Sequence, residues 1–400
     1  MSRADVTLVS LYPGPGQLHA GRSGVASYTA NLARSLTDAG ASVTVVAPVE
    51  PGVPDIHHDG RVRVERHFRR GVGALPAAAI AAEATDAPVV HLQHELFLYG
   101  GISSAPGLGP ALGRLRFARR SAVVTLHHVV DPVTVDDEFV RLFGVKLPPR
   151  LVRTVAGGVW SLLPQLAPAV VVHEPGFVQA VKGSTLIPHG IEPARRADRD
   201  AARRRLGLDP RTFVVLCFGY LAPYKGIDVA LEAAALTAGD VSVIVAGGPH
   251  PRLGPDYERG LRRRYAGVAT FTGHVPEEEL SATFAAADAA LLPYPRPFSS
   301  SGALALALAH GTPVLVSCPL AACVGARASL AVPSDPAALA GRLRTIASDP
   351  RLLEQIRQAS AELAHGRGWS DVAQRHIDLY EEVSDGARPA GRRVRAGQPG

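Results

Sequence analysis

Lys225 lies at a position in the chain where a phosphate ligand could bind. Lys225 lies in the turn GYLAPYKG, between an apolar run at 213–218 and a helical pattern that begins at Ile227. Open α/β sheets bind ligands beyond the carboxyl ends of such strands. Only three of the chain's 42 basic residues are lysines, and lysine is a compact charge suited to phosphate, whereas arginine suits planar bidentate partners. The turn therefore predicts a phosphate contact, with a solvent-exposed turn lysine as the alternative.

A second anion site is indicated by the serines of residues 299–302. This SSSG segment follows a strand that ends at Leu292 and a proline-rich loop, and it precedes a helix-forming run from Ala303 to His310. Small residues of this kind cap a helix N-terminus. Such a terminus offers free backbone amides and a partial positive charge to an anion. A diphosphate could bind there, although ordinary capping needs no ligand.

The first half of the chain supplies a similar loop. Residues 21–24, GRSG, follow the first apolar run and precede a helical pattern over 25–36. Small residues let a ligand approach the backbone closely. The loop resembles a glycine-rich dinucleotide turn without its full spacing, so its signal is weak on its own.

Histidines end several strands of this first half. His91 and His94 point to opposite faces of their strand, so they form no natural metal pair and we expect no zinc site. His127, in VVTLHH, is the best placed to face a ligand at the carboxyl end of a strand. Its neighbour His128 is expected on the opposite face. A satisfied core histidine is the alternative for His127.

These residues need parallel sheets to position them. Short valine-rich runs alternate with longer helical patterns, which predicts an α/β protein of two doubly wound domains with a ligand site between them. The boundary is expected near Glu192, which gives a first domain of residues 1–192 and a second of 193–365. The expected strands are 6–11, 42–47, 62–67, 89–93, 122–126, 169–172 and 185–187, then 213–218, 241–246, 269–272, 289–292, 313–317 and 330–332.

The end of the chain leaves two alternatives open. Residues 366–385 follow a glycine break and show helical spacing, so they either cross back to the first domain or close the second. Residues 386–400 are rich in Gly, Pro and Arg and are expected to be disordered. Their charges could favour an anionic membrane face, with a solvated tail as the alternative.

Composition excludes several functional classes. The chain has 400 residues, 46% of them hydrophobic, and a net charge of +6. No signal-like segment or membrane-spanning run is evident, so a cytoplasmic protein is expected, peripheral at the inner membrane face if the tail binds lipid. Aromatic residues are 6% of the chain and the arginines are scattered among acids, which argues against nucleic-acid binding. The three cysteines show no metal-ligand spacing and indicate reduced thiols.

In their order, the motifs resemble the family 4 glycosyltransferases of the GT-B fold. They are SGVASYTANLA, QHELFLYGG, VVTLHH, VVVHEPGF, LIPHGIEP, FGYLAPYKGIDVALEA, VAGGPH, FTGHVPEEEL, AADAALLPY and ALAHGTPVLVS. The resemblance implies transfer of a sugar, with retention of configuration, from a nucleotide diphosphate donor such as GDP-mannose or a UDP-sugar. The acceptor would be a glycan, a lipid-linked molecule or a small molecule. It also implies that no metal or other cofactor is needed.

The resemblance assigns roles to particular residues. His127 matches the histidine beside the transferred sugar, and His189 with Gly190 matches the turn that enters the interdomain linker. Glu95 and Tyr99, in QHELFLYGG, are assigned to the acceptor side, with a loop-capping carboxylate as the alternative for Glu95. The residues assigned to the donor are Gly24, Tyr220, Lys225, Gly247, Ser300, Ser301 and Gly302, of which Lys225 would contact the diphosphate and share the catalytic role with His127.

Two departures from the family pattern motivate a competing hypothesis. The arginine that usually precedes the lysine is Tyr220 here, and the two glutamates usually found around the phosphate loop are Phe298 and Leu306. The SSG loop looks like a variant branch of the family. A degenerate, non-catalytic protein that binds a nucleotide or a partner is therefore the alternative function, and a nucleotide-sugar epimerase is a third.

Overall fold

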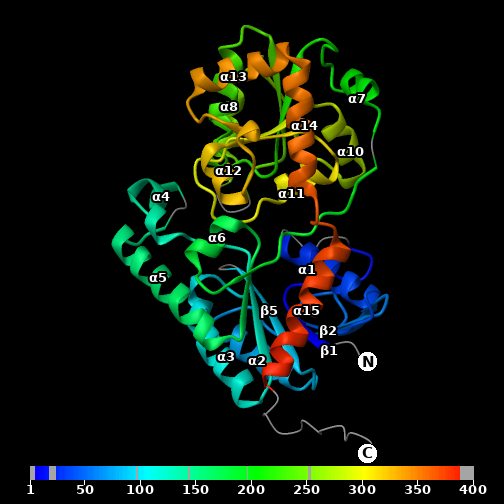
Figure 1. Ribbon diagram of the computed structural model, residues 1–400, viewed down its shortest axis with the longest axis vertical. Helices are drawn as coiled ribbons and strands as arrows, with labels where there is room; N and C mark the ends of the chain where they lie inside the picture. The colour runs from blue at the N-terminus through cyan, green and yellow to red at the C-terminus, as the bar shows by residue number, and fades with distance from the viewer. Residues whose placement is uncertain are drawn as a thin grey trace, which may run out of the picture.

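The chain folds into two domains, each built on its own twisted sheet. The computed structural model describes residues 5–17, 24–95, 98–142, 145–195, 197–250 and 254–387. In Figure 1 the first domain lies below the second, and the last helix runs back along the first.

The first sheet has the strand order β3-β4-β2-β1-β5-β6-β7-β8 and is parallel except for the antiparallel pair β3 and β4. The sequence did not predict β3, because its four residues, IHHD, are polar and lie at the edge of the sheet. The strands are β1 (Asp5–Val9), β2 (Ser42–Pro48), β3 (Ile56–Asp59), β4 (Val62–Phe68), β5 (Val89–His94), β6 (Ser121–Leu126), β7 (Ala169–Val172) and β8 (Thr185–Leu186).

The helices of this domain are α1 (Gly24–Asp38), α2 (Ala74–Glu83), α3 (Leu108–Phe117), α4 (Asp137–Leu142), α5 (Pro149–Leu166) and α6 (Pro175–Ala180), with the 3-10 turns η1 (Ile102–Gly107) and η2 (Pro132–Thr134). They enclose an apolar core on each face of the sheet.

The second sheet is wholly parallel, in the order β11-β10-β9-β12-β13-β14. Its strands are β9 (Phe213–Phe218), β10 (Val241–Ala246), β11 (Ala269–Gly273), β12 (Ala289–Leu292), β13 (Val314–Ser317) and β14 (Ala331–Val332). Its helices are α7 (Arg199–Arg205), α8 (Ile227–Ala235), α9 (Asp256–Arg264), α10 (Glu277–Ala285), α11 (Gly302–Ala309), α12 (Cys318–Val324), α13 (Pro336–Ser348) and α14 (Pro350–Ala364), with η3 (Pro223–Lys225) and η4 (Ala328–Leu330).

The strand orders predict where a ligand can bind. In the first sheet, the chain adds strands on one side of β1 and then, from β5 on, on the other side. The second sheet changes direction in the same way between β9 and β12. Loops diverge at such switch points and leave a crevice beyond the carboxyl ends of the strands. The loops after β1 and β5 carry Gly24 and Glu95, and those after β9 and β12 carry Lys225 and Ser301.

The last helix, α15 (Trp369–Ala387), packs on the first domain although it follows α14 of the second. Its side chains Val372, Ile377 and Tyr380 belong to the core beneath α1. The backbone amide of Ile191 donates to the carbonyl of Arg367 at 2.8 Å, so the two crossing segments pair with one another. A Cβ on Gly190 would lie 2.4 Å from the indole of Trp369, so only glycine fits at this crossing. The basic segment 388–400 lies outside the described residues.

Candidate functional site

Lys225 is held in place by a tyrosine that follows β12. Its Nζ donates to the hydroxyl of Tyr294 at 2.9 Å and lies 4.8 Å from the centre of that ring. Burial disfavours the charged form, but the oxygens of Tyr294 and Tyr224 raise the pKa of Lys225 above its ordinary value. The half-buried side chain is therefore a fixed positive charge at neutral pH and not a mobile, solvent-exposed lysine.

Two glycines let the neighbouring loops approach one another. Gly226 ends η3 with φ of 63°, and a Cβ there would lie 2.1 Å from the carbonyl oxygen of Pro293. Gly247 has φ of 143°, and its Cβ would lie 2.1 Å from the carbonyl oxygen of Gly219. Both positions accept only glycine. Gly247 thus shapes the wall of the site instead of offering a side chain to it.

The N-terminus of α11 lies next to the lysine. Ser301 is its N-cap, and its hydroxyl accepts from the amide of Leu304 at 3.2 Å. The same hydroxyl lies 3.1 Å from the Tyr294 oxygen that accepts from Lys225. One hydrogen-bonded chain therefore joins the ammonium to the start of α11, and Gly302 is exposed beside it. This arrangement concentrates positive potential at a single point.

The loop before α11 touches the first domain directly. The amide of Val129 donates to the carbonyl of Phe298 at 2.8 Å, and His128 pairs with Ser299 in an antiparallel bridge. Arg296 reaches the carbonyl of Thr134 at 2.7 Å. These bonds bring the end of β6, with His127 and His128, against the serine loop before α11.

His127 is buried in an aromatic cluster. Its ring lies 4.8 Å from that of Tyr28 and 5.0 Å from that of His173. His189 and Trp369 pack on the same tyrosine at 5.0 and 5.2 Å. Burial and the neighbouring histidines hold the pKa of His127 well below its usual range, so the imidazole is neutral.

Hydrogen bonds orient the ring of His127. Its Nε2 lies 2.8 Å from Oε1 of Gln93, which implies that Nε2 carries the proton. The Gln93 amide lies 3.2 Å from His91, and His91 lies 2.6 Å from the hydroxyl of Tyr380 on α15. Sequence reasoning missed this network because Gln93 and Tyr380 are far apart in the chain.

The expected position of His128 is wrong. We expected it to face away from the site, but its half-buried ring packs on Phe298 at 5.0 Å and its Nε2 lies 3.8 Å from the Glu95 carboxylate. The reason is that β6 ends at Leu126, so the alternation of a strand no longer applies to the next two residues. Glu95 is therefore directed to the domain contact.

The assignment of Tyr99 to the acceptor side does not fit its surroundings. Tyr99 is buried, and its hydroxyl donates to the carbonyls of Val9 and Gln93, each at 2.9 Å. The side chain ties the ends of β1 and β5 together. The hydroxyl proton of Tyr99 is thus directed to the backbone, and the buried ring does not face solvent.

Three further positions named in the sequence analysis have the following surroundings. A Cβ on Gly24 would meet no atom within 4 Å, so the start of α1 is open, while residues 21–23 lie outside the described residues. Tyr220, in the place of the usual arginine, is exposed and packs on His250. Phe298, in the place of the first glutamate, packs on Tyr224 at 5.5 Å.

A buried ion pair at the domain junction also escaped the sequence analysis. Arg367 lies 3.3 Å from Glu174, and both side chains are almost fully buried. Burial raises the pKa of Glu174, although Arg367 and Ser300 act to lower it. Glu174 lies in the motif VVVHEPGF. Arg367 lies in the Gly-Arg-Gly segment before α15, and nothing in that segment of the sequence indicates that Arg367 pairs with Glu174.

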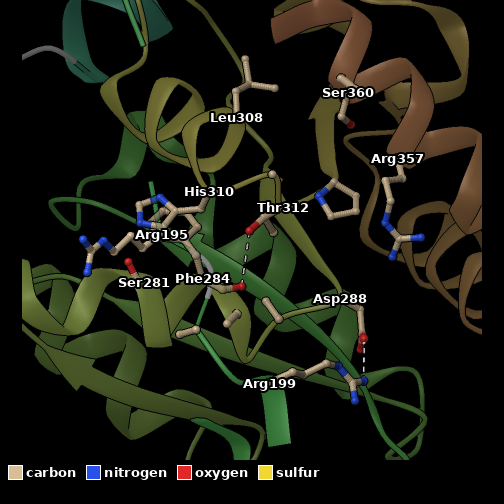
Figure 2. A pocket seen from close by; sticks show the side chains of 16 residues that line it. Arg195, Arg199, Ser281, Phe284, Asp288, Leu308, His310, Thr312, Arg357 and Ser360 are labelled. Atoms are coloured by element: carbon tan, nitrogen blue, oxygen red, sulfur yellow. Dashed lines mark hydrogen bonds and ion pairs between the residues drawn. The ribbon is translucent and has the colours of Figure 1, made fainter. Parts of the chain in front are cut away.

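Two cavities lie elsewhere than at Lys225. One, of about 310 Å³, is drawn in Figure 2 and sits at the amino ends of β12 and β13, beside Asp288 and Pro313. Asp288 there is paired with Arg199 at 2.8 Å. The other, of about 300 Å³, is lined by residues such as His173 and Arg367. Neither cavity is lined by Lys225.

Within the described residues no group of three or more His, Cys, Asp or Glu side chains could hold a metal ion. The three cysteines are free thiols. Among the same residues no helix is both long and apolar enough to cross a bilayer.

Known proteins share both the motifs and the architecture. A family model described as Glycosyl transferases group 1 matches residues 198–363. A D-inositol 3-phosphate glycosyltransferase of Streptomyces coelicolor is 30% identical over 335 residues, which cover 79% of this chain and 68% of that protein. A second, from Streptomyces avermitilis, is 33% identical over 238 residues, so that the aligned part covers 54% of this chain and spans half the length of that relative.

Solved structures agree along nearly the whole chain. The sucrose-phosphate synthase of Thermosynechococcus elongatus aligns with a TM-score of 0.71 at 21% identity, covering 96% of this chain and 100% of that one. Anabaena HepE, in complex with UDP and glucose, aligns with a TM-score of 0.67 at 16% identity, covering 95% and 100%. Two parallel-sheet domains that meet at their ligand-binding edges define a GT-B fold. The chain belongs to the family 4 glycosyltransferases.

Proposed function

We propose that this protein transfers a sugar, with retention of configuration, from a nucleotide diphosphate donor to a carbohydrate, lipid-linked or small-molecule acceptor. The observation that carries the proposal is the hydrogen-bonded chain from Lys225 through Tyr294 to Ser301. It directs a fixed ammonium and the amides of a helix N-terminus at one point, where a diphosphate leaving group would develop charge. Stabilisation of that kind is electrostatic and needs no covalent step.

The two domains have separate tasks in this proposal. The second domain holds the diphosphate, with Gly247, Ser300 and Gly302 forming the wall around it. The first supplies the buried, neutral His127 beside the transferred sugar. Burial holds the ring of His127 neutral, and Gln93 fixes it through Nε2, so we assign it the role of positioning the sugar by hydrogen bonding. Glu95, next to His128, is proposed to meet the acceptor.

The relatives suggest which compounds to try first. D-inositol 3-phosphate is the acceptor in the names of the relatives, and UDP and ADP are bound in two of the structural neighbours. A small phosphorylated polyol would be an acceptor of matching polarity. Peripheral contact of the basic segment 388–395 with an anionic membrane is proposed as well, since four arginines lie within it.

The test is nucleoside diphosphate release from a panel of UDP-, GDP- and ADP-sugars by the purified full chain, with and without D-inositol 3-phosphate. We expect release with one donor, faster when an acceptor is present, and a product whose anomeric configuration by NMR matches the donor. Calorimetric binding of a nucleoside diphosphate without turnover of any donor would favour the degenerate protein. Inversion of configuration would contradict the retaining mechanism.

A further inference from the structure

Helix α5 turns an apolar face outward. Its exposed aliphatic residues recur at spacings of four, four, three and four, which places them on one side of the helix. Only Trp160 and Leu163 of this helix are buried. The exposed residues, 37 to 55% accessible and called the α5 stripe below, are Leu151, Val155, Val159, Leu162 and Leu166.

The elements around α5 extend this apolar surface. Phe117, the last residue of α3, is 92% exposed, and Val133 in η2 is 90% exposed. Both α3 and η2 pack against α5, which lies along the outer edge of the first domain in Figure 1. Together with Leu147, this region holds eight of the fifteen large hydrophobic side chains that are exposed in the described chain. Such a concentration marks an interaction surface, because scattered exposed residues would not gather in this way.

Helix α5 itself carries only basic charges. Residues 149–166 contain no acid, and Arg150 and Arg153 lie on the same helix, four and seven residues after Lys146. Of the acids near the neighbouring α4, Asp136 and Glu138 are each paired with Arg296 at 2.8 Å. The helix therefore combines exposed aliphatic side chains with basic ones.

We propose that the α5 stripe docks on an anionic lipid surface. A helix with an apolar face and basic flanks lies in the plane of the interface, with its aliphatic side chains among the acyl chains and its arginines at the phosphates. A second copy of this chain is a poorer occupant, because a two-fold contact would face the same basic helix with itself and supply no acid. The surface differs from the segment 388–395 and from the donor crevice.

Docking there would place the reaction near the membrane, a consequence that rests on the proposed function. Val133 adjoins Thr134, whose carbonyl accepts from Arg296 of the loop that leads to Ser299. The docking face is thus continuous with the contact between the domains. A lipid-linked acceptor could reach the crevice without leaving the bilayer surface.

The test is sedimentation of the full chain with vesicles of phosphatidylcholine, alone or mixed equally with phosphatidylglycerol. We expect binding to the mixed vesicles and a loss of at least tenfold in Val155→Asp/Leu162→Asp. The matched control is Ile80→Asp/Leu236→Asp, at side chains that are equally exposed but lie on other surfaces, and it should bind as wild type does. Arg150→Ala/Arg153→Ala should weaken binding to the mixed vesicles by about thirtyfold.

Further measurements separate the outcomes. Urea unfolding should be the same in the α5 variants and in the matched control, because the side chains replaced in them are exposed. Nucleoside diphosphate release from a soluble donor should also be unchanged in Val155→Asp/Leu162→Asp, so failed docking and a failed transferase assignment are distinguishable. The proposal is overturned if Arg392→Ala/Arg393→Ala/Arg395→Ala abolishes vesicle binding while the α5 variants do not. It is also overturned if the wild type binds no vesicles and forms a dimer that Val155→Asp/Leu162→Asp dissociates.

Discussion

The two domains face one crevice with opposite electrostatic character. The second domain presents Lys225, a charged side chain whose pKa is raised and which is tied by hydrogen bonds to a helix start. The first presents His127 inside a cluster of rings that burial keeps neutral. Under the proposed function, the charged side of the site would receive the diphosphate, and the neutral side would hold an uncharged sugar by shape and hydrogen bonding. Each prediction below tests one half of this contrast.

Loss of the positive charge of Lys225 should have the largest effect on activity. Lys225→Ala removes a charge-assisted contact worth roughly 1.5 to 3 kcal/mol, so donor affinity or turnover should fall by about 10-fold to 100-fold. Lys225→Arg should restore only part of the activity, because a planar guanidinium does not replace a compact ammonium packed on Tyr294. Steady-state kinetics with the best donor provide the measurement. Lys182→Ala, at an exposed lysine, is the control, and unchanged kinetics in Lys225→Ala would remove the phosphate assignment.

A substitution at His127 tests the uncharged side of the site, which the first domain supplies. His127→Ala should lower kcat steeply while nucleoside diphosphate binding, measured by calorimetry, stays within about threefold, or under roughly 0.7 kcal/mol. Because the ring is buried against Tyr28, the free energy of unfolding should also drop by about 1 to 3 kcal/mol. His127→Gln, which keeps a hydrogen-bonding side chain, should recover part of the stability. If nucleotide binding falls as much as turnover, the histidine is structural and the contrast between the domains fails.

Stability should depend on pH through the first domain. Burial lowers the pKa of His173 to about 3 and those of His189 and His376 to about 4, against about 6.5 in the unfolded chain. Between these values the unfolded chain binds more protons than the folded one, so the free energy of unfolding falls as the pH is lowered from about 7 toward 4. Each such histidine contributes at most about 1.4 kcal/mol per pH unit. Glu174, whose pKa is raised, acts in the opposite sense over its own titration range.

Urea unfolding at several pH values measures this slope. His173→Asn should flatten it, whereas His58→Gln, at an exposed histidine outside the cluster, should leave it unchanged. A stability that is constant between pH 7 and pH 5 would show that the ring cluster opens readily to water.

The smallest effect is expected from chelation. Lys225 and the amides of α11 supply positive charge to the diphosphate, and Phe298 and Leu306 stand where the family has carboxylates. Transfer activity should therefore change by less than about twofold in excess EDTA, since these two positions supply no carboxylates to hold Mg²⁺. A strict requirement for a divalent ion, restored by adding the ion back, would contradict this account of the donor side.

Local signals in the sequence determined much of the fold and the donor side. Alternating valine-rich and helical runs predicted both sheets, because period and hydrophobicity are properties of neighbouring residues. A lysine in an arginine-rich chain and a serine cap before α11 could be found in the same way. Strand β3 was missed because its stabilisation comes from pairing with β4 and not from an apolar run of its own.

Tertiary structure alone decided which partners these residues meet. Tyr294 joins Lys225 to Ser301, and Arg367 finds Glu174 across 193 residues of sequence. His128 lies at the contact between the domains, because the chain leaves its strand at Leu126 and the period of two ends there. The outward direction of the α5 stripe was equally hidden, since an amphipathic pattern specifies an apolar face but not whether a sheet covers it. Which side chains pair, and whether an apolar helix face is covered, depends on how distant segments of the chain pack together. No local sequence pattern encodes that packing.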